Sequence, residues 1–413
     1  MKYPFFLITK KLCSLILMLT ISASMLSAYD FYIGGIYYAY GASDVSVTYG
    51  DQKYSGSIVI PASITVNGKN LPVVGISHNA FQDCEDLLSV SIPYSVKTIG
   101  QHSFENCSKL SSINLPTGLN SIGRRAFKNC HNLTSLFLPD GLEVIDSETF
   151  MNCESLLSIV IPNSITAINN SAFSGCSGLK SIKIGEKVNR IGDSAFSGCT
   201  GLTALVIPNN VSGSGTNAFK GCTNIETLVI EDSETVFSYG GFSDLKPINF
   251  YLGRVNGTIG EYSQNVSYSS YLPIDFSNTK VLTIGKYIET VEKRAGVALS
   301  NSTWRAQLYQ GNFEVIYAMS APSFSFNNTT KIYSQLYVPI GMKESFLANQ
   351  YYKDFFSITE MDIADMWHGE VEIPDFPDPN PDPDPNYMKC DVNGDGEVNI
   401  ADINRVIEAI LSH

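Results

Sequence analysis

A twelve-residue segment near the carboxyl end, DVNGDGEVNIAD, places oxygen-bearing side chains at the spacing of a calcium loop. Such a loop binds Ca²⁺ through positions 1, 3, 5, 7, 9 and 12, and a glycine at position 6 allows a sharp turn. Gly396 occupies position 6. The predicted ligands are Asp391, Asn393, Asp395, the backbone carbonyl of Glu397, Asn399 and Asp402. We therefore predict calcium as a cofactor and an EF-hand-like module over residues 388–413.

The residues around this loop predict what the module contacts. Residues 366–387 are rich in Pro and Asp and predict an extended linker. After the loop, Ile403, Val406, Ile407 and Ile410 share one face of a predicted helix. Because the loop ends in Asp and follows a Pro-rich segment, it resembles a dockerin repeat, which implies a dockerin-type partner. Dockerins of cellulosomes carry two repeats and this chain has one, so the helix face has three candidate partners: another protein, a second copy of the chain, or the solenoid described below.

The rest of the sequence lacks the spacing of a catalytic site. Its five histidines are scattered, and no HExxH motif, CxxC motif, Gly-rich phosphate loop or nucleophile elbow is present. The formal net charge is −13, so a nucleic acid would find no basic surface to neutralise its phosphates. We predict no catalytic residues, no enzymatic activity and no nucleic-acid partner.

A second pattern runs through the middle of the chain: one Phe and one Cys recur every 23 residues. A fixed period of this length indicates stacked coils that bury their apolar faces against one another. The rings should then form one internal ladder, and the cysteines should be buried thiols, with disulfide pairing and metal binding as alternatives. The ladder residues are Phe81, Phe104, Phe127, Phe150, Phe173, Phe196 and Phe219. The cysteines are Cys84, Cys107, Cys130, Cys153, Cys176, Cys199 and Cys222.

Within one coil, short alternating runs predict two strands, and residue types predict two corners with positive φ. One predicted corner is the residue before each cysteine, which is always Asp, Asn or Gly. The other contains only the same three residue types: Gly100, Gly123, Asp146, Asn169, Gly192 and Gly215. Between the corners, the spacing of Phe150, Cys153 and Leu156 predicts a helical turn on the outer side. Ser214 departs from the pattern, because the repeat places an isoleucine there.

The repeated pattern, clearest in LLSIVIPNSITAINNSAFSGC from Leu156 to Cys176, resembles the BspA-like leucine-rich repeats of bacterial surface and secreted proteins. The resemblance implies a right-handed repeat solenoid with a parallel β-sheet, 23-residue repeats and capped ends. It also implies adhesion or protein binding for some members. The domain boundaries predicted from these patterns are a signal peptide (1–28), an N-terminal cap with a first irregular coil (29–73), regular repeats (74–231), irregular repeats with a C-terminal cap (232–365), the linker and the calcium module.

The amino terminus predicts export. Lys2, Lys10 and Lys11 precede an uncharged apolar run and then the small residues Ser27 and Ala28, which is typical of a secretory signal peptide. No later stretch is long and apolar enough to predict a membrane span. We therefore expect a secreted or cell-surface bacterial protein without a transmembrane segment once the signal is removed.

The outward strand positions predict a binding face. One column is small and hydroxylated, and its neighbour becomes apolar toward the later coils. That second column gives the candidate residues Phe137, Val160, Lys183, Val206 and Val229. The alternative is that these residues only reflect β-propensity on a crowded sheet. The leading functional hypothesis is a protein or glycan ligand on an external surface. The second hypothesis is calcium-dependent assembly with extracellular polysaccharide-degrading machinery, in which the solenoid is a spacer.

Overall fold

The protein is described from a computed structural model, which covers residues 29–233, 237–254, 257–259, 266–268, 274–286, 313–320, 328–350 and 352–366. The chain divides into two units, Met1–Ile373 and Pro374–His413, and every described residue belongs to the first unit. The predicted signal peptide, calcium loop and tail helix lie outside the described residues.

The N-terminal strands cover the first coil of the repeat. Strands β1, β2 and β3 are antiparallel, and β3 pairs with β6 in parallel. Strands β5 and β6 form a hairpin that turns at Asn67 and Gly68, both with positive φ. The ring of Tyr54 packs 4.5 Å from that of Phe81 and closes the end of the aromatic ladder. The bounds are β1 (Phe31–Ile33), β2 (Ile36–Tyr40), β3 (Val45–Thr48), β4 (Gly56–Val59), β5 (Ser63–Val66) and β6 (Lys69–Ile76).

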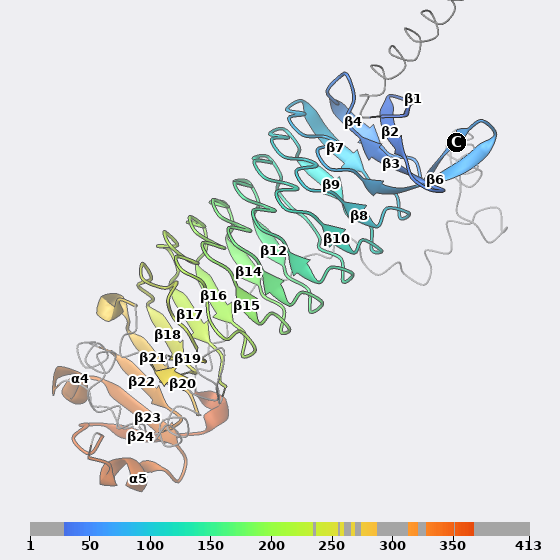
Figure 1. The fold of residues 1–413 in the computed structure, drawn as a ribbon. Coiled ribbons are helices and arrows are strands. Elements are labelled where there is room, and N and C mark those ends of the chain that lie inside the picture. Colours follow the sequence, from blue (N-terminus) through green and yellow to red (C-terminus); the bar gives the residue numbers. More distant parts are fainter. Residues whose placement is uncertain are drawn as a thin grey trace, which may run out of the picture. The chain divides into compact units, whose positions relative to one another are not determined.

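The regular coils form two columns of short parallel strands, which follow one another along the chain in Figure 1. The coil of residues 133–153 has a strand in the second column only. In the first column, Ile159 points into the core while Ser158 and Val160 stay half-buried, which is the alternation of a strand with one solvated face. The first column comprises β7 (Leu87–Ser91), β9 (Ser112–Asn114), β12 (Ser158–Val160), β14 (Ser181–Lys183), β16 (Ala204–Ile207) and β17 (Thr227–Ile230). The second comprises β8 (Thr98–Ile99), β10 (Ser121–Ile122), β11 (Val144–Ile145), β13 (Ala167–Ile168) and β15 (Arg190–Ile191).

The predicted aromatic ladder is confirmed. All seven rings are fully buried, and successive centroids from Phe81 to Phe219 lie 4.8 to 5.5 Å apart with interplanar angles of 13° or less. Each cysteine lies beside this ladder as a buried free thiol. The Cys153 Sγ, for example, donates to the backbone carbonyl of Phe127 on the preceding coil at 3.2 Å. The rings and thiols belong to one continuous core that crosses every coil.

One of the two predicted corners is confirmed and the other is wrong. The residue before each cysteine has positive φ, from Asp83 to Gly221. At the other corner the left-handed residue lies two positions later than predicted, for example at Glu148 instead of Asp146. The glycines at the predicted position serve close packing instead: a Cβ on Gly100 would lie 2.5 Å from the backbone nitrogen of His78 on the preceding coil.

The predicted helical turn between the corners is also wrong. The buried side chains here are Phe150, Cys153 and Leu156, which point into the core. The backbone forms separate turns instead of a helix. In these turns the backbone nitrogen of Cys153 donates to the carbonyl of Phe150, and that of Leu156 donates to the carbonyl of Cys153. Outside the core at this corner, Asn152 Nδ2 donates to Asn129 Oδ1 at 2.8 Å. Asn129 in turn donates to Asn106 at 2.6 Å, so an amide ladder fixes the spacing of these coils.

Beyond the regular repeats, the first column continues as a seven-stranded parallel sheet from β16 to β24. Its later strands are β18 (Asn249–Leu252), β21 (Val281–Ile284), β22 (Val315–Ala318), β23 (Gln335–Pro339) and β24 (Ile358–Met361). A separate antiparallel pair is formed by β19 (Gly257–Ile259) and β20 (Val266–Tyr268). The described helices are α4 (Asn328–Tyr333), α5 (Lys343–Ala348) and the 3₁₀ turns η2 (Phe276–Asn278) and η4 (Ile363–Asp365).

Candidate functional site

The predicted binding face lies on the solvent side of the first strand column. Val160 pairs directly with Lys183, and Val206 pairs with Val229. Phe137 belongs to the coil before β12, in residues that form no regular strand. Phe137, Val160 and Val206 are half-buried, and Lys183 is exposed. Three apolar side chains with one cation among them are thus partly open to solvent on this face.

Val229 does not belong to the open part of this face. Its side chain is only 2% exposed, which corrects the prediction that it contacts a ligand. It pairs with Tyr251 on β18, whose larger ring is itself buried. The Tyr251 hydroxyl donates to Asp232 Oδ2 at 2.6 Å, and this hydrogen bond holds the ring over the end of the column. The open stretch of this column that begins at Phe137 therefore ends at Val206.

Sequence reasoning did not find that the same column continues through three later tyrosines. The pairing register runs from Val229 to Tyr251, Thr283, Tyr317, Tyr337 and Thr359. Tyr317 and Tyr337 are half-buried, and their rings stack at 5.4 Å. Segments of unequal length separate these strands and hide the register in the sequence. The alternation inside each strand was the one usable signal.

Several charged groups of the repeat form ion pairs between coils. Glu148 accepts hydrogen bonds of 2.8 Å from Arg125, Lys128 and Arg124. The Arg125 guanidinium, aided by Lys128 and Arg124, holds the pKa of the Glu148 carboxyl well below its usual range. This carboxylate stays ionised and paired, and that state suits a structural role better than proton transfer.

The buried thiols are poor candidates for nucleophiles. Burial raises the pKa of Cys176 to about 12, and the same cause raises the pKa of Cys153. A thiol reacts through its thiolate, which is scarce at neutral pH when the pKa is raised. Within the described part of the chain, no group of three His, Cys, Asp or Glu side chains could hold a metal ion. No helix among those residues is long and apolar enough to cross a membrane.

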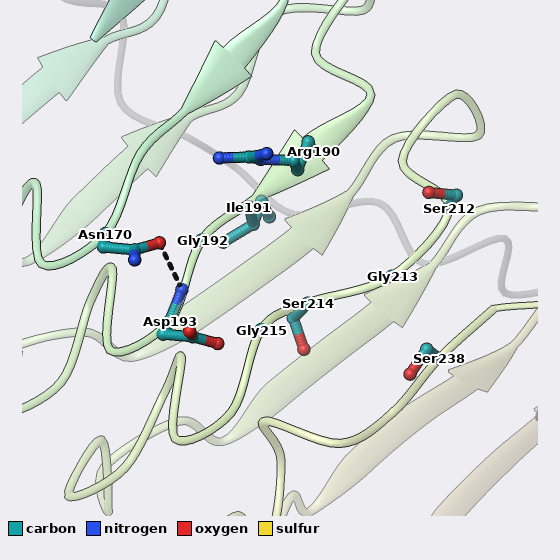
Figure 2. Close-up of a pocket in the computed structure, with 10 residues that line it drawn as sticks. All are labelled: Asn170, Arg190, Ile191, Gly192, Asp193, Ser212, Gly213, Ser214, Gly215 and Ser238. Atoms are coloured by element: carbon teal, nitrogen blue, oxygen red, sulfur yellow. Dashed lines mark hydrogen bonds between the residues drawn. The ribbon is translucent and has the colours of Figure 1, made fainter. Parts of the chain in front are cut away.

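A pocket of about 500 Å³ lies where the regular repeat ends. It opens beside the second strand column, across the coils of β13 and β15 and the two coils that follow, and Figure 2 shows the residues that line it. Its walls are mostly polar side chains and glycine backbone. They comprise Asn170, Arg190, Ile191, Gly192, Asp193, Ser212, Gly213, Ser214, Gly215 and Ser238.

The repeats also match a known protein family. The BspA type Leucine rich repeat region matches in six copies, over residues 74–201 and 143–268. Residues 74–268 therefore contain leucine-rich repeats of the BspA type. No curated protein matches it significantly.

Several solved structures of bacterial leucine-rich repeat proteins are similar to this chain. A leucine-rich repeat protein from Bacteroides ovatus shares 20% identity with a TM-score of 0.52, covering 81% of this chain and 100% of that one. The T. pallidum leucine-rich repeat protein shares 34% identity with a TM-score of 0.43, covering 48% and 90%. A leucine-rich cell surface protein from Faecalibacterium prausnitzii shares 21% identity with a TM-score of 0.46, covering 82% and 96%. The first of these supports the repeat fold.

Proposed function

We propose that this protein is a non-enzymatic, exported interaction module that binds a partner on an external surface through its sheet face. The observation that carries the proposal is a row on four successive coils, in which the partly exposed apolar side chains of Phe137, Val160 and Val206 accompany the exposed Lys183. Burial of such apolar side chains by a partner lowers the free energy of binding, and the small residues of the neighbouring column leave the side chains accessible.

The character of this row favours a protein as the partner. Phe137 and the two valines offer apolar area without many hydrogen-bond donors, and the adjacent Lys183 adds one positive charge. An apolar centre beside a charged group is the usual composition of a protein interface. A glycan remains the second type of ligand for this face, and a binding assay with both ligand types separates them.

The sheet-face proposal is tested with Phe137→Asp combined with Val160→Asp. The pair places two charges in the apolar row, so we expect capture of the protein partner from matrix or cell-surface preparations to fall at least tenfold while the fold is kept. A matched control is Tyr94→Asp combined with Val144→Asp, which charges two exposed apolar residues outside the row. Equal capture by the test variant and the control would remove the sheet face as the binding site.

A second proposed function is calcium-dependent assembly through residues 388–413, supported by the ligand spacing from Asp391 to Asp402. Calcium titration of the full chain should produce a structural response that Asp391→Ala with Asp402→Ala abolishes. Deletion of residues 366–413 separates the two functions. If partner capture survives deletion, the solenoid is the binder; if only complex formation with a dockerin-type partner is lost, the tail is the connector.

A further inference from the structure

The pocket at the end of the regular repeats exists because the coil that contains Ser214 departs from the pattern. In the preceding coil the inward residue of the second column is Ile191, and it pairs with Ser214. Gly213, next to Ser214 on the same coil, pairs with Ser238 on the following coil. The two backbones are so close that a Cβ on Gly213 would lie 2.6 Å from the Cβ of Ser238. Small residues in place of a branched apolar side chain leave the cavity of about 500 Å³, which is within the range of small-ligand sites.

The polar side chains at the rim are oriented by one hydrogen bond each. Asn170 Oδ1 accepts from the backbone nitrogen of Asp193 at 3.1 Å, and Asp193 Oδ1 accepts from the nitrogen of Thr216 at 2.7 Å. Arg190 Nη2 donates to Asn169 Oδ1 at 3.1 Å. The second carboxylate oxygen of Asp193, the Asn170 amide nitrogen and the remaining guanidinium donors therefore keep capacity for a ligand. These groups are positioned before binding, which reduces the entropic cost of association.

One polar group of the pocket is buried without a partner. Ser214 is 8% exposed, and its Oγ forms no hydrogen bond with any described residue. Figure 2 shows Ser214 between Asp193 and Ser238. The Ser214 Oγ has almost no solvent-accessible surface, so the groups of the pocket that can contact a ligand are the exposed rim side chains of Asn170, Arg190 and Asp193.

We propose that this cavity, the Ser214 pocket, binds one neutral sugar residue of a glycan. Each hydroxyl group of a sugar is both a donor and an acceptor, as the mixed lining requires: Arg190 donates, Asp193 accepts, and Asn170 and Ser238 can do either. The site goes beyond the proposed function because it lies on the second strand column, away from Phe137 and Val160.

Other ligand classes fit the lining less well. The formal charges of Arg190 and Asp193 cancel, so a charged ligand that pairs with one of them is repelled by the other. Ile191 is the one large apolar residue in the lining, so an apolar side chain of a peptide would leave the surrounding polar groups unpaired.

The test uses saturation-transfer NMR on the full chain with methyl glycosides of glucose, galactose, mannose and N-acetylglucosamine. Glucuronic acid and glucosamine serve as charged probes. We expect transfer to at least one neutral glycoside and at least tenfold weaker binding by Arg190→Ala combined with Asp193→Asn. Both residues are exposed, and asparagine can still accept from Thr216, so the fold should be kept. The matched control, Lys187→Ala with Asp140→Asn, removes the same charges on exposed residues elsewhere.

The results that would overturn the proposal are equally specific. They are no transfer from the wild-type protein to any neutral glycoside, transfer to the charged sugars alone, or equal binding by the pocket variant and its control. Phe137→Asp with Val160→Asp should leave sugar binding unchanged. Failure of the sheet-face proposal and failure of the pocket proposal are thereby distinguished.

Discussion

The ring of Phe150 lies parallel to that of Phe127 on the preceding coil, with the centroids 5.5 Å apart and an interplanar angle of 3°. Both rings are fully buried. This stacking means that each coil completes the core of its neighbour, so a coil in the middle of the array has no apolar interior of its own. Removal of one ring should therefore affect both adjacent coils.

Phe150→Ala should lower the free energy of unfolding by about 3–5 kcal/mol, the usual cost when a fully buried phenylalanine leaves a cavity. Urea unfolding followed by circular dichroism measures this change. Phe356→Ala is the matched control because Phe356 is 86% exposed, and its effect should stay within about 0.5 kcal/mol. Similar losses for both variants would contradict the ladder.

The cysteines beside the ladder should resist thiol reagents in the native protein. They are buried, and burial raises the pKa of Cys176 to about 12. Alkylation at pH 8 followed by peptide mass spectrometry should find Cys107 to Cys199 unmodified before unfolding and modified in urea. Rapid native labelling of these residues, or disulfides between neighbouring coils, would show that the thiols are accessible.

The aromatic ladder and one corner could be predicted from sequence because each has a recurring residue type. The second corner could not, because its left-handed residues, among them His102, Glu148 and Ser171, share no type. Backbone hydrogen bonds between coils hold them there, such as that from the Ser171 nitrogen to the Asp193 carbonyl at 2.9 Å. The glycines two positions earlier were mistaken for the corner because glycine serves both positive φ and close approach.

The contacts of Arg254 and the burial of Val229 also had no sequence signal. Arg254 is fully buried, and its guanidinium donates to the carbonyls of Pro208, Asn209 and Val211 while lying 4.8 Å above the Phe237 ring. The three hydrogen bonds join residues more than forty positions apart, and Arg254 lies where the period has already failed. Local sequence patterns reveal the 23-residue period, but they do not reveal the tertiary contacts of residues that lie beyond the regular repeats.

The corrected corner gives a discriminating pair of substitutions. Ser171 has a φ of 56°, so Ser171→Gly relieves left-handed strain of about 1–2 kcal/mol against a glycine entropy cost of about 0.5–1 kcal/mol. Its stability should rise slightly or stay equal. Asn169 has no positive φ, and Asn169→Gly should lower stability by about 0.5–1 kcal/mol. Thermal unfolding of the two variants measures the order, and the reverse order would restore the original prediction.

Glu148 should make the stability of the repeat depend on acid pH. Its pKa is lowered in the folded protein, chiefly by Arg125, so its contribution is complete above the unfolded carboxyl pKa of about 4.3 and is lost as the pH falls toward the folded value. At pH 7, Glu148→Gln should cost about 1–2 kcal/mol, since three cations lose their charged partner. Urea unfolding at pH 7 and pH 3 should show this difference shrinking in acid. Glu154→Gln is the control: Glu154 is half-exposed and 3.4 Å from His131, so its effect should be near zero at pH 7. A Glu148 effect that is equal at both pH values would exclude the ion pairs as its cause.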